Sequence, residues 1–273
     1  MKLYHFPAST CSQKVRVVLA EKGVEFESHV VNLLTGEQHS PDYVKLNPAH
    51  VVPTAVVGDV VLTESSLINE FIDDHFDGPS LRSSDSFERY HGAALVRYVD
   101  LQIHGKVGGV PTHAVLTRGI LADRTPEQIA AYLAAIPDPA DRALRESLLT
   151  HGVAAPEMQG ALRIIAQFIR RLEARLSEGR EWLSGEAFGL ADAGVLPYVI
   201  RFRDIGLDAY WDDGASPQVA DWIDRSTGRD SFAQAFTKWM PTEMAATFQR
   251  LAVEARPALA PMIHSAIAAP SKE

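Results

Sequence analysis

The sequence predicts an α/β domain over residues 1–78 followed by an all-helical domain over residues 86–273. Two observations carry this prediction. Short apolar runs with strand character alternate with helical patterns in the first 75 residues, whereas strand signals almost vanish later in the chain. A turn-rich linker, Asp77-Gly-Pro-Ser-Leu-Arg-Ser-Ser-Asp85, separates the two patterns and predicts the domain boundary.

The first domain should be a small open sheet with helices on both sides. Its expected strands are 2–6, 26–33, 54–57 and 60–63, and its expected helices are 9–23 and 65–75. Gly23 stands just past the end of the first helix, where glycine is favoured. Gly58-Asp59 predicts a hairpin turn. Between them, Glu37–Leu46 should be a loop with one helical turn.

The second domain should consist of helices joined by short turns. The expected helices are 87–107, 126–135, 138–149, 156–178, 191–202, 218–226, 232–239 and 243–255, the last with a weaker continuation beyond Pro257. The glycines of 105–109 do not predict a dinucleotide-binding loop, because no strand is expected before them and no helix after them.

Composition excludes several classes of protein. The chain has 273 residues and a formal charge of −9, which argues against nucleic-acid binding. No apolar run is long enough to span a bilayer, and Met1–His5 runs straight into a strand without a signal segment. The single cysteine, Cys11, excludes a disulfide framework and a zinc site of thiolates. These features indicate a reducing cytoplasm.

Two short motifs predict a binding site for a small zwitterionic peptide. The first, Leu46–Thr54 (LNPAHVVPT), is a loop whose Pro53 biases Val52 to an extended backbone that can pair with another extended chain. The second, Glu64-Ser65, places a carboxylate, a hydroxyl and unpaired N–H groups at a helix N-terminus. Together they offer partners for an ammonium group, a carboxylate and a peptide backbone.

These residues resemble the cytosolic glutathione S-transferase family. Residues 47–54 and 64–65 stand where that family holds glutathione, and Glu181–Ala193 (EWLSGEAFGLADA) resembles its folding signature in the helical domain, as 219–232 resembles its late helical segment. Gly189 occupies the helix-cap position of that signature instead of serine or threonine, while Asp192 is retained, so the reciprocal capping box is half present. The resemblance implies a thioredoxin-like first domain, glutathione as co-substrate and a homodimer.

A weaker resemblance concerns residues 136–153, which lengthen the helical domain. They are similar to an insertion in bacterial transferases related to the glutathione-dependent β-etherases, which cleave aryl ethers of lignin fragments.

The catalytic candidates lie at the start of the first helix. A thiol ionises with a pKa of about 8.5, and a hydroxyl donor at a helix N-terminus lowers that pKa. The resemblance favours Ser9 as this donor, with Thr10 and Ser12 as alternatives; all three are also ordinary helix caps. Cys11 offers a different chemistry, a mixed disulfide with glutathione, or is a small buried thiol. A Cys-x-x-Cys pair is absent because Lys14 occupies the fourth position.

The resemblance assigns the glutathione contacts residue by residue. Glu64 would bind the γ-glutamyl ammonium and Ser65 the adjacent carboxylate. Val52 would pair with the cysteinyl unit through its backbone, and the Val52–Pro53 bond would be cis. The candidates for the glycyl carboxylate are His39 and His50.

The second substrate should lie against the helical domain. Its candidate contacts are Tyr98, Asp100, His104, Lys106 and His113, although Asp100 is also placed to reach the glutathione of a neighbouring subunit. His104 and His113 lack a third ligand at helical spacing, so no metal site is predicted. We therefore expect an enzyme that directs a glutathione thiolate at an electrophilic, aromatic substrate. The alternatives are a glutathione-dependent peroxidase or thiol-disulfide reductase, and a non-catalytic binding protein of the same fold.

Overall fold

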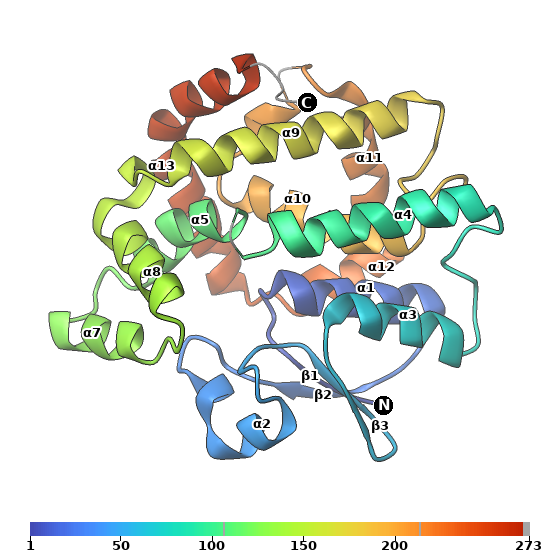
Figure 1. The fold of residues 1–273 in the computed structure, drawn as a ribbon, viewed down its shortest axis with the longest axis horizontal. Helices are drawn as coiled ribbons and strands as arrows, with labels where there is room; N and C mark the ends of the chain where they lie inside the picture. Colours follow the sequence, from blue (N-terminus) through green and yellow to red (C-terminus); the bar gives the residue numbers. More distant parts are fainter. Residues whose placement is uncertain (106, 213, 270–273) are drawn as a thin grey trace. The chain divides into compact units, whose positions relative to one another are not determined.

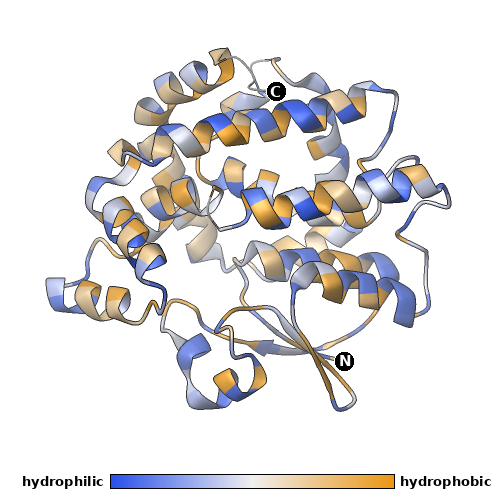
Figure 2. Cartoon of the chain, in the orientation of Figure 1, coloured by the Kyte–Doolittle hydropathy of each residue, from blue (hydrophilic) through white to orange (hydrophobic). Residues whose placement is uncertain are grey.

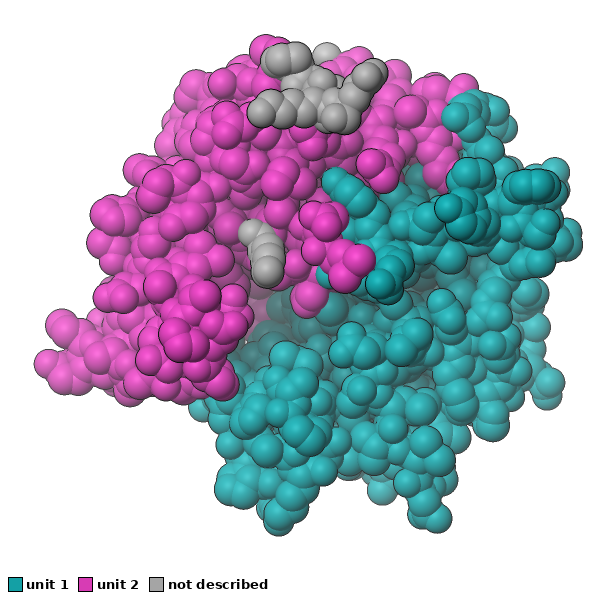
Figure 3. All heavy atoms as spheres, viewed as in Figure 1, with its two compact units in different colours: residues 1–100, 178–197, 221–241 teal, residues 101–177, 198–220, 242–273 magenta. Residues whose placement is uncertain are grey.

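The computed structural model describes residues 1–105, 107–212 and 214–269. The chain forms two compact units (Figure 3): unit 1 comprises residues 1–100, 178–197 and 221–241, and unit 2 comprises residues 101–177, 198–220 and 242–273. Two segments from the predicted helical domain thus group with the first hundred residues. The division of the chain between residues 78 and 86 stays a prediction.

Unit 1 contains a four-stranded mixed sheet in the order β2-β1-β3-β4. The strands are β1 (Lys2–His5), β2 (Glu27–Val30), β3 (Thr54–Val57) and β4 (Val60–Leu62). β1 pairs parallel with β2 and antiparallel with β3, so that Leu3 faces Ser28 on one side and Ala55 on the other. In Figure 1, α1 (Thr10–Lys22) and α3 (Ser65–His75) lie on one side of the strands and α2 (Pro41–Leu46) on the other. The predicted small sheet with helices on both sides is confirmed.

Two local predictions in unit 1 need correction. The second strand is shorter than the predicted 26–33, because only four residues pair with β1. The predicted loop 37–46 is largely helical: a 3₁₀ turn, η1 (Glu37–His39), precedes α2, whose N-terminus is capped by the Ser40 side chain. Pro41 is the first residue of α2, a position that proline favours. The helix has only six residues, which is too few for a hydrophobic periodicity to reveal it.

The folding signature of unit 1 centres on the buried carboxylate of Asp192. Its Oδ2 accepts the N–H groups of Ser184 and Gly189, both at 3.1 Å, and the Ser184 hydroxyl accepts the N–H of Ala191 at 3.1 Å. A Cβ on Gly189 would lie 2.3 Å from the Leu81 carbonyl oxygen. Glycine is therefore required at the cap, and Ser184 provides the hydroxyl that is missing at position 189.

The remaining helices follow the predicted order. Those that include residues of unit 1 are α4 (Ser86–Tyr98), η2 (Val99–Ile103), α10 (Leu190–Asp204), α11 (Pro217–Thr227), α12 (Asp230–Phe232) and η6 (Ala233–Thr237). Those confined to unit 2 are α5 (Gly109–Thr112), η3 (His113–Thr117), α6 (Arg118–Ile120), α7 (Pro126–Ala134), α8 (Pro139–His151), η4 (Gly152–Ala154), α9 (Met158–Ser177), η5 (Asp208–Tyr210) and α13 (Thr242–Ala268).

Unit 2 is built around α9, which carries separate hydrophobic and hydrophilic bands in Figure 2. Its apolar side, including Leu162, Ile165 and Phe168, is fully buried. The helical stretch 109–120 was not predicted, so the expectation that no helix follows the glycines of 105–109 was wrong. The nearest element before these glycines is η2, which is a helix and not a strand. Within the described residues, none of the helices combines the length and apolar character that crossing a membrane would require.

Candidate functional site

The turn before α1 presents the predicted catalytic residues in different environments. Ser9 is the N-cap of α1, and its Oγ accepts the N–H of Ser12 at 3.2 Å. Ser12 is fully buried, and its own Oγ accepts the N–H of Phe6 at 3.3 Å. Thr10 and Cys11 are half-buried in the first turn. Ser12 is therefore committed to the interior, which leaves Ser9, Thr10 and Cys11 as the groups that a ligand can reach.

A buried network of polar side chains shapes the loop between α2 and β3. The Tyr43 hydroxyl donates to the Val51 carbonyl at 2.6 Å and lies 3.0 Å from the Thr54 hydroxyl. The Asn47 amide donates to the same carbonyl and the same hydroxyl, both at 2.9 Å. Burial raises the pKa of Tyr43, which keeps its phenol protonated. Sequence reasoning missed this network.

The same loop holds Val52 with its main chain unpaired. The Val52–Pro53 peptide bond is cis. Val52 is 6% exposed as a whole residue, and its N–H and carbonyl form no hydrogen bond with another main-chain group among the described residues. A buried residue with an unpaired main chain is the arrangement that an extended peptide needs for backbone pairing.

The two histidines of the predicted glycyl site lie together. His39 follows Gln38 in η1 and His50 precedes Val51, and their Nδ1 atoms are 3.1 Å apart. At this distance one Nδ1 carries the hydrogen and the other accepts it. Burial, followed by the charge of His50, lowers the pKa of His39. His50 has φ = 58°, a left-handed conformation that costs energy in a non-glycine residue.

Glu64 and Ser65 form the start of α3. Glu64 is exposed and has φ = 64°, so it is the second strained residue of the site. Its carbonyl accepts the N–H of Ile68 at 2.9 Å, which begins the helix. Ser65 is 8% exposed and is the first helical residue. The arrangement provides an exposed carboxylate beside the N–H groups of an eleven-residue helix.

The candidates for the second substrate belong to both units. Tyr98 ends α4 in unit 1. In unit 2, His104 is exposed and its Nδ1 lies 3.1 Å from the Tyr198 hydroxyl, whereas the Nδ1 of His113 lies 2.8 Å from the Thr117 hydroxyl. Burial, followed by the charges of two arginines, lowers the pKa of His113 well below its usual value, so its imidazole is neutral.

Two further residues were predicted for the second-substrate site, Asp100 and Lys106. Asp100 Oδ1 pairs with the buried Nζ of Lys14 at 2.8 Å, and Lys14 also donates to the Ser66 hydroxyl at 2.6 Å. Lys106 lies outside the described residues. No cluster of three metal-ligating side chains occurs in the part of the chain that the structure describes.

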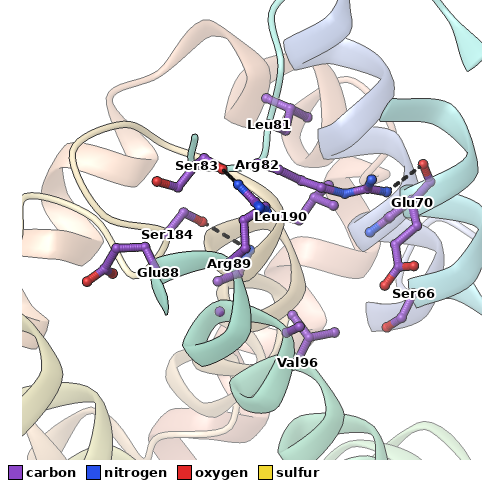
Figure 4. A pocket seen from close by; sticks show the side chains of 14 residues that line it. Ser66, Glu70, Leu81, Arg82, Ser83, Glu88, Arg89, Val96, Ser184 and Leu190 are labelled. Atoms are coloured by element: carbon purple, nitrogen blue, oxygen red, sulfur yellow. Dashed lines mark hydrogen bonds between the residues drawn. The ribbon is translucent and has the colours of Figure 1, made fainter. Parts of the chain in front are cut away.

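A separate cavity of about 70 Å³ lies in unit 1 between α3, the linker, α4 and the start of α10 (Figure 4). The Arg82 side chain extends toward the carbonyl of Glu70, to which it donates at 3.1 Å, and Arg89 donates to the Ser83 carbonyl at 2.9 Å. Both arginines at its rim are thus engaged by the protein. Asn69, whose Oδ1 is buried without a partner, also lines this cavity.

Comparison with known proteins identifies the family. Residues 8–75 match the glutathione S-transferase N-terminal domain, and residues 155–225 match the glutathione S-transferase C-terminal domain. The two matches together span just over half of the chain. The chain belongs to the glutathione S-transferase family, which confirms the predicted resemblance, the thioredoxin-like and helical folds and, at the level of the family, the prediction of a transferase enzyme.

Individual relatives match over most of the chain. Protein LigF from Sphingobium sp. (strain NBRC 103272 / SYK-6) is 28% identical over 243 residues, covering 87% of this chain and 93% of that protein. The crystal structure of beta-etherase LigF from Sphingobium sp. strain SYK-6 matches with a TM-score of 0.76 and 27% identity, covering 87% of this chain and 98% of that chain. Maleylacetoacetate isomerase from Pseudomonas aeruginosa is 27% identical over 253 residues, covering 90% of this chain and 100% of that protein.

A third relative matches a shorter stretch. Glutathione S-transferase Z1 from Arabidopsis thaliana is 31% identical over 138 residues, which are 45% of this chain and 62% of that protein. The match therefore spans less than two thirds of that relative's length.

Proposed function

We propose that this chain binds glutathione, ionises its thiol and directs the thiolate at an electrophilic carbon of an aromatic substrate. The observation that carries the proposal is the unpaired main chain of Val52, held by the buried Tyr43–Asn47–Thr54 network in a chain of the glutathione S-transferase family. Buried polar groups without hydrogen-bond partners cost free energy, so this network fixes the loop in the one conformation that satisfies them.

The roles of the glutathione contacts follow from their chemistry. The N–H and carbonyl of Val52, next to Pro53, would pair with the cysteinyl unit. Glu64 would bind the ammonium group. Ser65, together with the N–H groups of α3, would bind the neighbouring carboxylate. His50, supported by His39, would bind the glycyl carboxylate.

The thiolate would form at the turn before α1. Ser9 would donate its hydroxyl hydrogen to the sulfur, with Thr10 and Cys11 as the alternatives, and Ser12 would hold the turn from within. Lowering a thiol pKa by one to two pH units requires about 1.4–2.8 kcal/mol of additional thiolate stabilisation. One charge-assisted hydrogen bond of about 1.5–3 kcal/mol is sufficient.

Within this activity we propose cleavage of β-aryl ethers, because the beta-etherase LigF matches over 87% of the chain. The thiolate attacks the carbon that bears the aryloxy group, a C–S bond forms, and the C–O bond breaks with its electron pair on oxygen. The phenolate takes a proton from water, so the products are a glutathione thioether and a phenol. Tyr98, His104 and His113 would contact the aromatic substrate.

The test is mass spectrometry of products after mixing the protein with glutathione and an aryl β-ketoether, with a glutathione-free control. Thioether and phenol formed only with glutathione would support both levels of the proposal. Intact ether, with a thioether formed from a generic aryl halide, would retain the transferase and exclude the etherase. Oxidised glutathione formed from a peroxide or a disulfide would support the reductase alternative, and glutathione binding without any turnover would support a binding protein.

A second candidate is cis–trans isomerisation, favoured by the match to maleylacetoacetate isomerase over 90% of the chain. Addition of the thiolate to a carbon–carbon double bond allows rotation, and its elimination returns glutathione unchanged. Isomerisation of a maleyl substrate without net consumption of glutathione would support this reading.

The proposal includes a homodimer in the cytoplasm. α3 and α4 of unit 1 each carry exposed apolar side chains: Leu67, Phe87 and Tyr90 are 60%, 74% and 68% exposed. Apolar groups this exposed on neighbouring elements suit contact with a second copy. Light scattering of the wild type and of Leu67→Glu would test it, because a monomeric wild type contradicts the dimer.

A further inference from the structure

A single buried arginine holds the turn that leads to Ser9. Arg16 lies in α1, and its side chain is 1% exposed. Its Nη2 donates to the Pro7 carbonyl at 2.8 Å and its Nη1 to the Phe6 carbonyl at 3.3 Å. The Phe6 carbonyl also accepts the N–H of Ser9 at 3.1 Å. Arg16 and Ser9 thus share one acceptor, and the position of the turn depends on the guanidinium.

The same guanidinium is fixed from two further directions. Its Nε donates to the Ala235 carbonyl of η6 at 2.7 Å, and its Nη1 lies 3.0 Å from Nδ1 of His5. Arginine can only donate, so Nδ1 of His5 accepts and Nε2 carries the hydrogen toward the Ser28 hydroxyl at 2.8 Å. Trp239 covers the cluster, with its ring centroid 5.7 Å from Cζ of Arg16.

The positive charge of Arg16 is not balanced by an anion. All its acceptors are neutral, and it forms no ion pair with any described residue. Burial and the arginine lower the pKa of His5 to about 3, so this imidazole stays neutral. Lys238 lies over the same Trp239 ring, with its Nζ 5.4 Å from the ring centroid, and adds a charge of the same sign. A buried cation without a counter-ion is costly, and an anion bound nearby recovers part of that cost.

We propose that Arg16 is a positioning residue of the thiolate site: it holds the Phe6–Ser9 turn, and its unbalanced charge stabilises the thiolate of glutathione bound there. This inference rests on the proposed glutathione function. Ser9 is a neutral donor and supplies no charge. In this proposal the charge comes from Arg16, on the interior side of the turn.

The experiment is a pH titration of the ultraviolet thiolate absorbance of the glutathione complex. The spectrum of ligand-free protein is subtracted, so that Cys11 and the tyrosines cancel. Arg16→Gln removes the charge, whereas Arg16→Lys keeps the charge and loses the planar set of donors. We expect the thiol pKa to rise by about one pH unit, a tenfold loss of thiolate at neutral pH, in Arg16→Gln and by less in Arg16→Lys.

A matched control comes from the other end of α1. Arg229 donates to both carboxylate oxygens of Glu21 at 2.8 Å, so it also ties α1 to the segment that contains η6. Arg229→Gln should lower stability to guanidinium chloride and leave the thiol pKa unchanged. A thiol pKa that rises equally in Arg229→Gln would assign the effect to loosening of α1 in general and overturn the proposal.

The remaining outcomes separate this inference from the proposed function. A lowered thiol pKa in the wild type that is equally low in Arg16→Gln overturns the role of Arg16 and retains the transferase. Where Arg16→Gln does not fold, His5→Asp takes its place, because it sets a carboxylate beside the guanidinium and balances the charge; an equally low thiol pKa in that variant overturns the role of Arg16 in the same way. A wild-type complex whose thiol pKa is that of free glutathione overturns the proposed function itself. Calorimetry at acidic pH, where the thiol is protonated, should give similar glutathione affinities for the wild type and Arg16→Lys.

Discussion

The buried carboxylate of Asp192 allows a quantitative prediction for unit 1. Its oxygens accept four N–H groups: the main chains of Leu183 at 2.8 Å, Ser184 at 3.1 Å and Gly189 at 3.1 Å, and the Trp222 indole at 2.8 Å. In Asp192→Asn one oxygen becomes an NH₂ group, which cannot accept, so two of the four N–H groups lose their acceptor and face a donor. Hydrogen bonds to a charged group contribute about 1.5–3 kcal/mol each, so the gross loss is about 3–6 kcal/mol.

The amide also avoids a cost, because burial raises the pKa of Asp192 and so disfavours its charged form. We therefore expect a net loss near the lower limit, about 3 kcal/mol, which is a large fraction of a typical stability. Guanidinium chloride unfolding, followed by tryptophan fluorescence, measures it. The control is Asp42→Asn, whose side chain is 94% exposed and which should change stability by less than about 0.5 kcal/mol. A loss below about 1 kcal/mol for Asp192→Asn would refute the reasoning, since the orphaned N–H groups would then have other partners.

Three further predictions concern the cap, the pH dependence and the catalytic turn. Gly189→Ser should lower the melting temperature although it completes the capping box, because its Cβ would meet the Leu81 carbonyl oxygen at 2.3 Å. The pKa of His5 is lowered from 6.5 to about 3, so its contribution to stability is present above pH 6.5 and is lost as the pH falls; between pH 7.5 and 5 we expect this loss to be about 2 kcal/mol in denaturant titrations and absent from His5→Asn. In steady-state conjugation assays, Ser9→Ala should lower kcat about 100-fold, whereas Cys11→Ala should retain nearly full turnover; the reverse order would assign the chemistry to the thiol.

Local patterns predicted most of the fold because each element of unit 1 has its own signal. α1 begins at its serine-rich turn and ends at Gly23, which has φ = 68° as the left-handed helix end requires. The helical stretch 109–120 was missed because Gly105, Gly108 and Gly109 obscure its start. α13 continues through two prolines, Pro257 and Pro261. These errors arise where packing in unit 2 overrides local propensity.

The predicted site residues are those with a local motif, and the missed ones act through partners distant in the sequence. Tyr43 and Asn47 matter because Thr54 and the Val51 carbonyl meet them, which no spacing rule encodes. Arg16 could have been noticed in the sequence, because it is a charged residue inside the apolar run Val15–Leu19. Such a residue is either exposed or hydrogen-bonded within the interior. Only the fold shows that it is buried, and that its partners include a carbonyl 219 residues away.

The attachments of α1 explain why a late segment of the chain belongs to unit 1. Near its middle, Arg16 bonds the Ala235 carbonyl, and near its end Glu21 accepts from Arg229. The helix that Ser9 caps is therefore held near its middle and near its end by residues 229–235. The first hundred residues supply every proposed glutathione contact, but they do not supply the acceptor and the ion-pair partner that fix α1. The resemblance of residues 219–232 to the family's late helical segment thus has a physical basis. Arg229 lies in this segment and Ala235 directly follows it, and both hold α1, the helix that begins after the turn at Ser9.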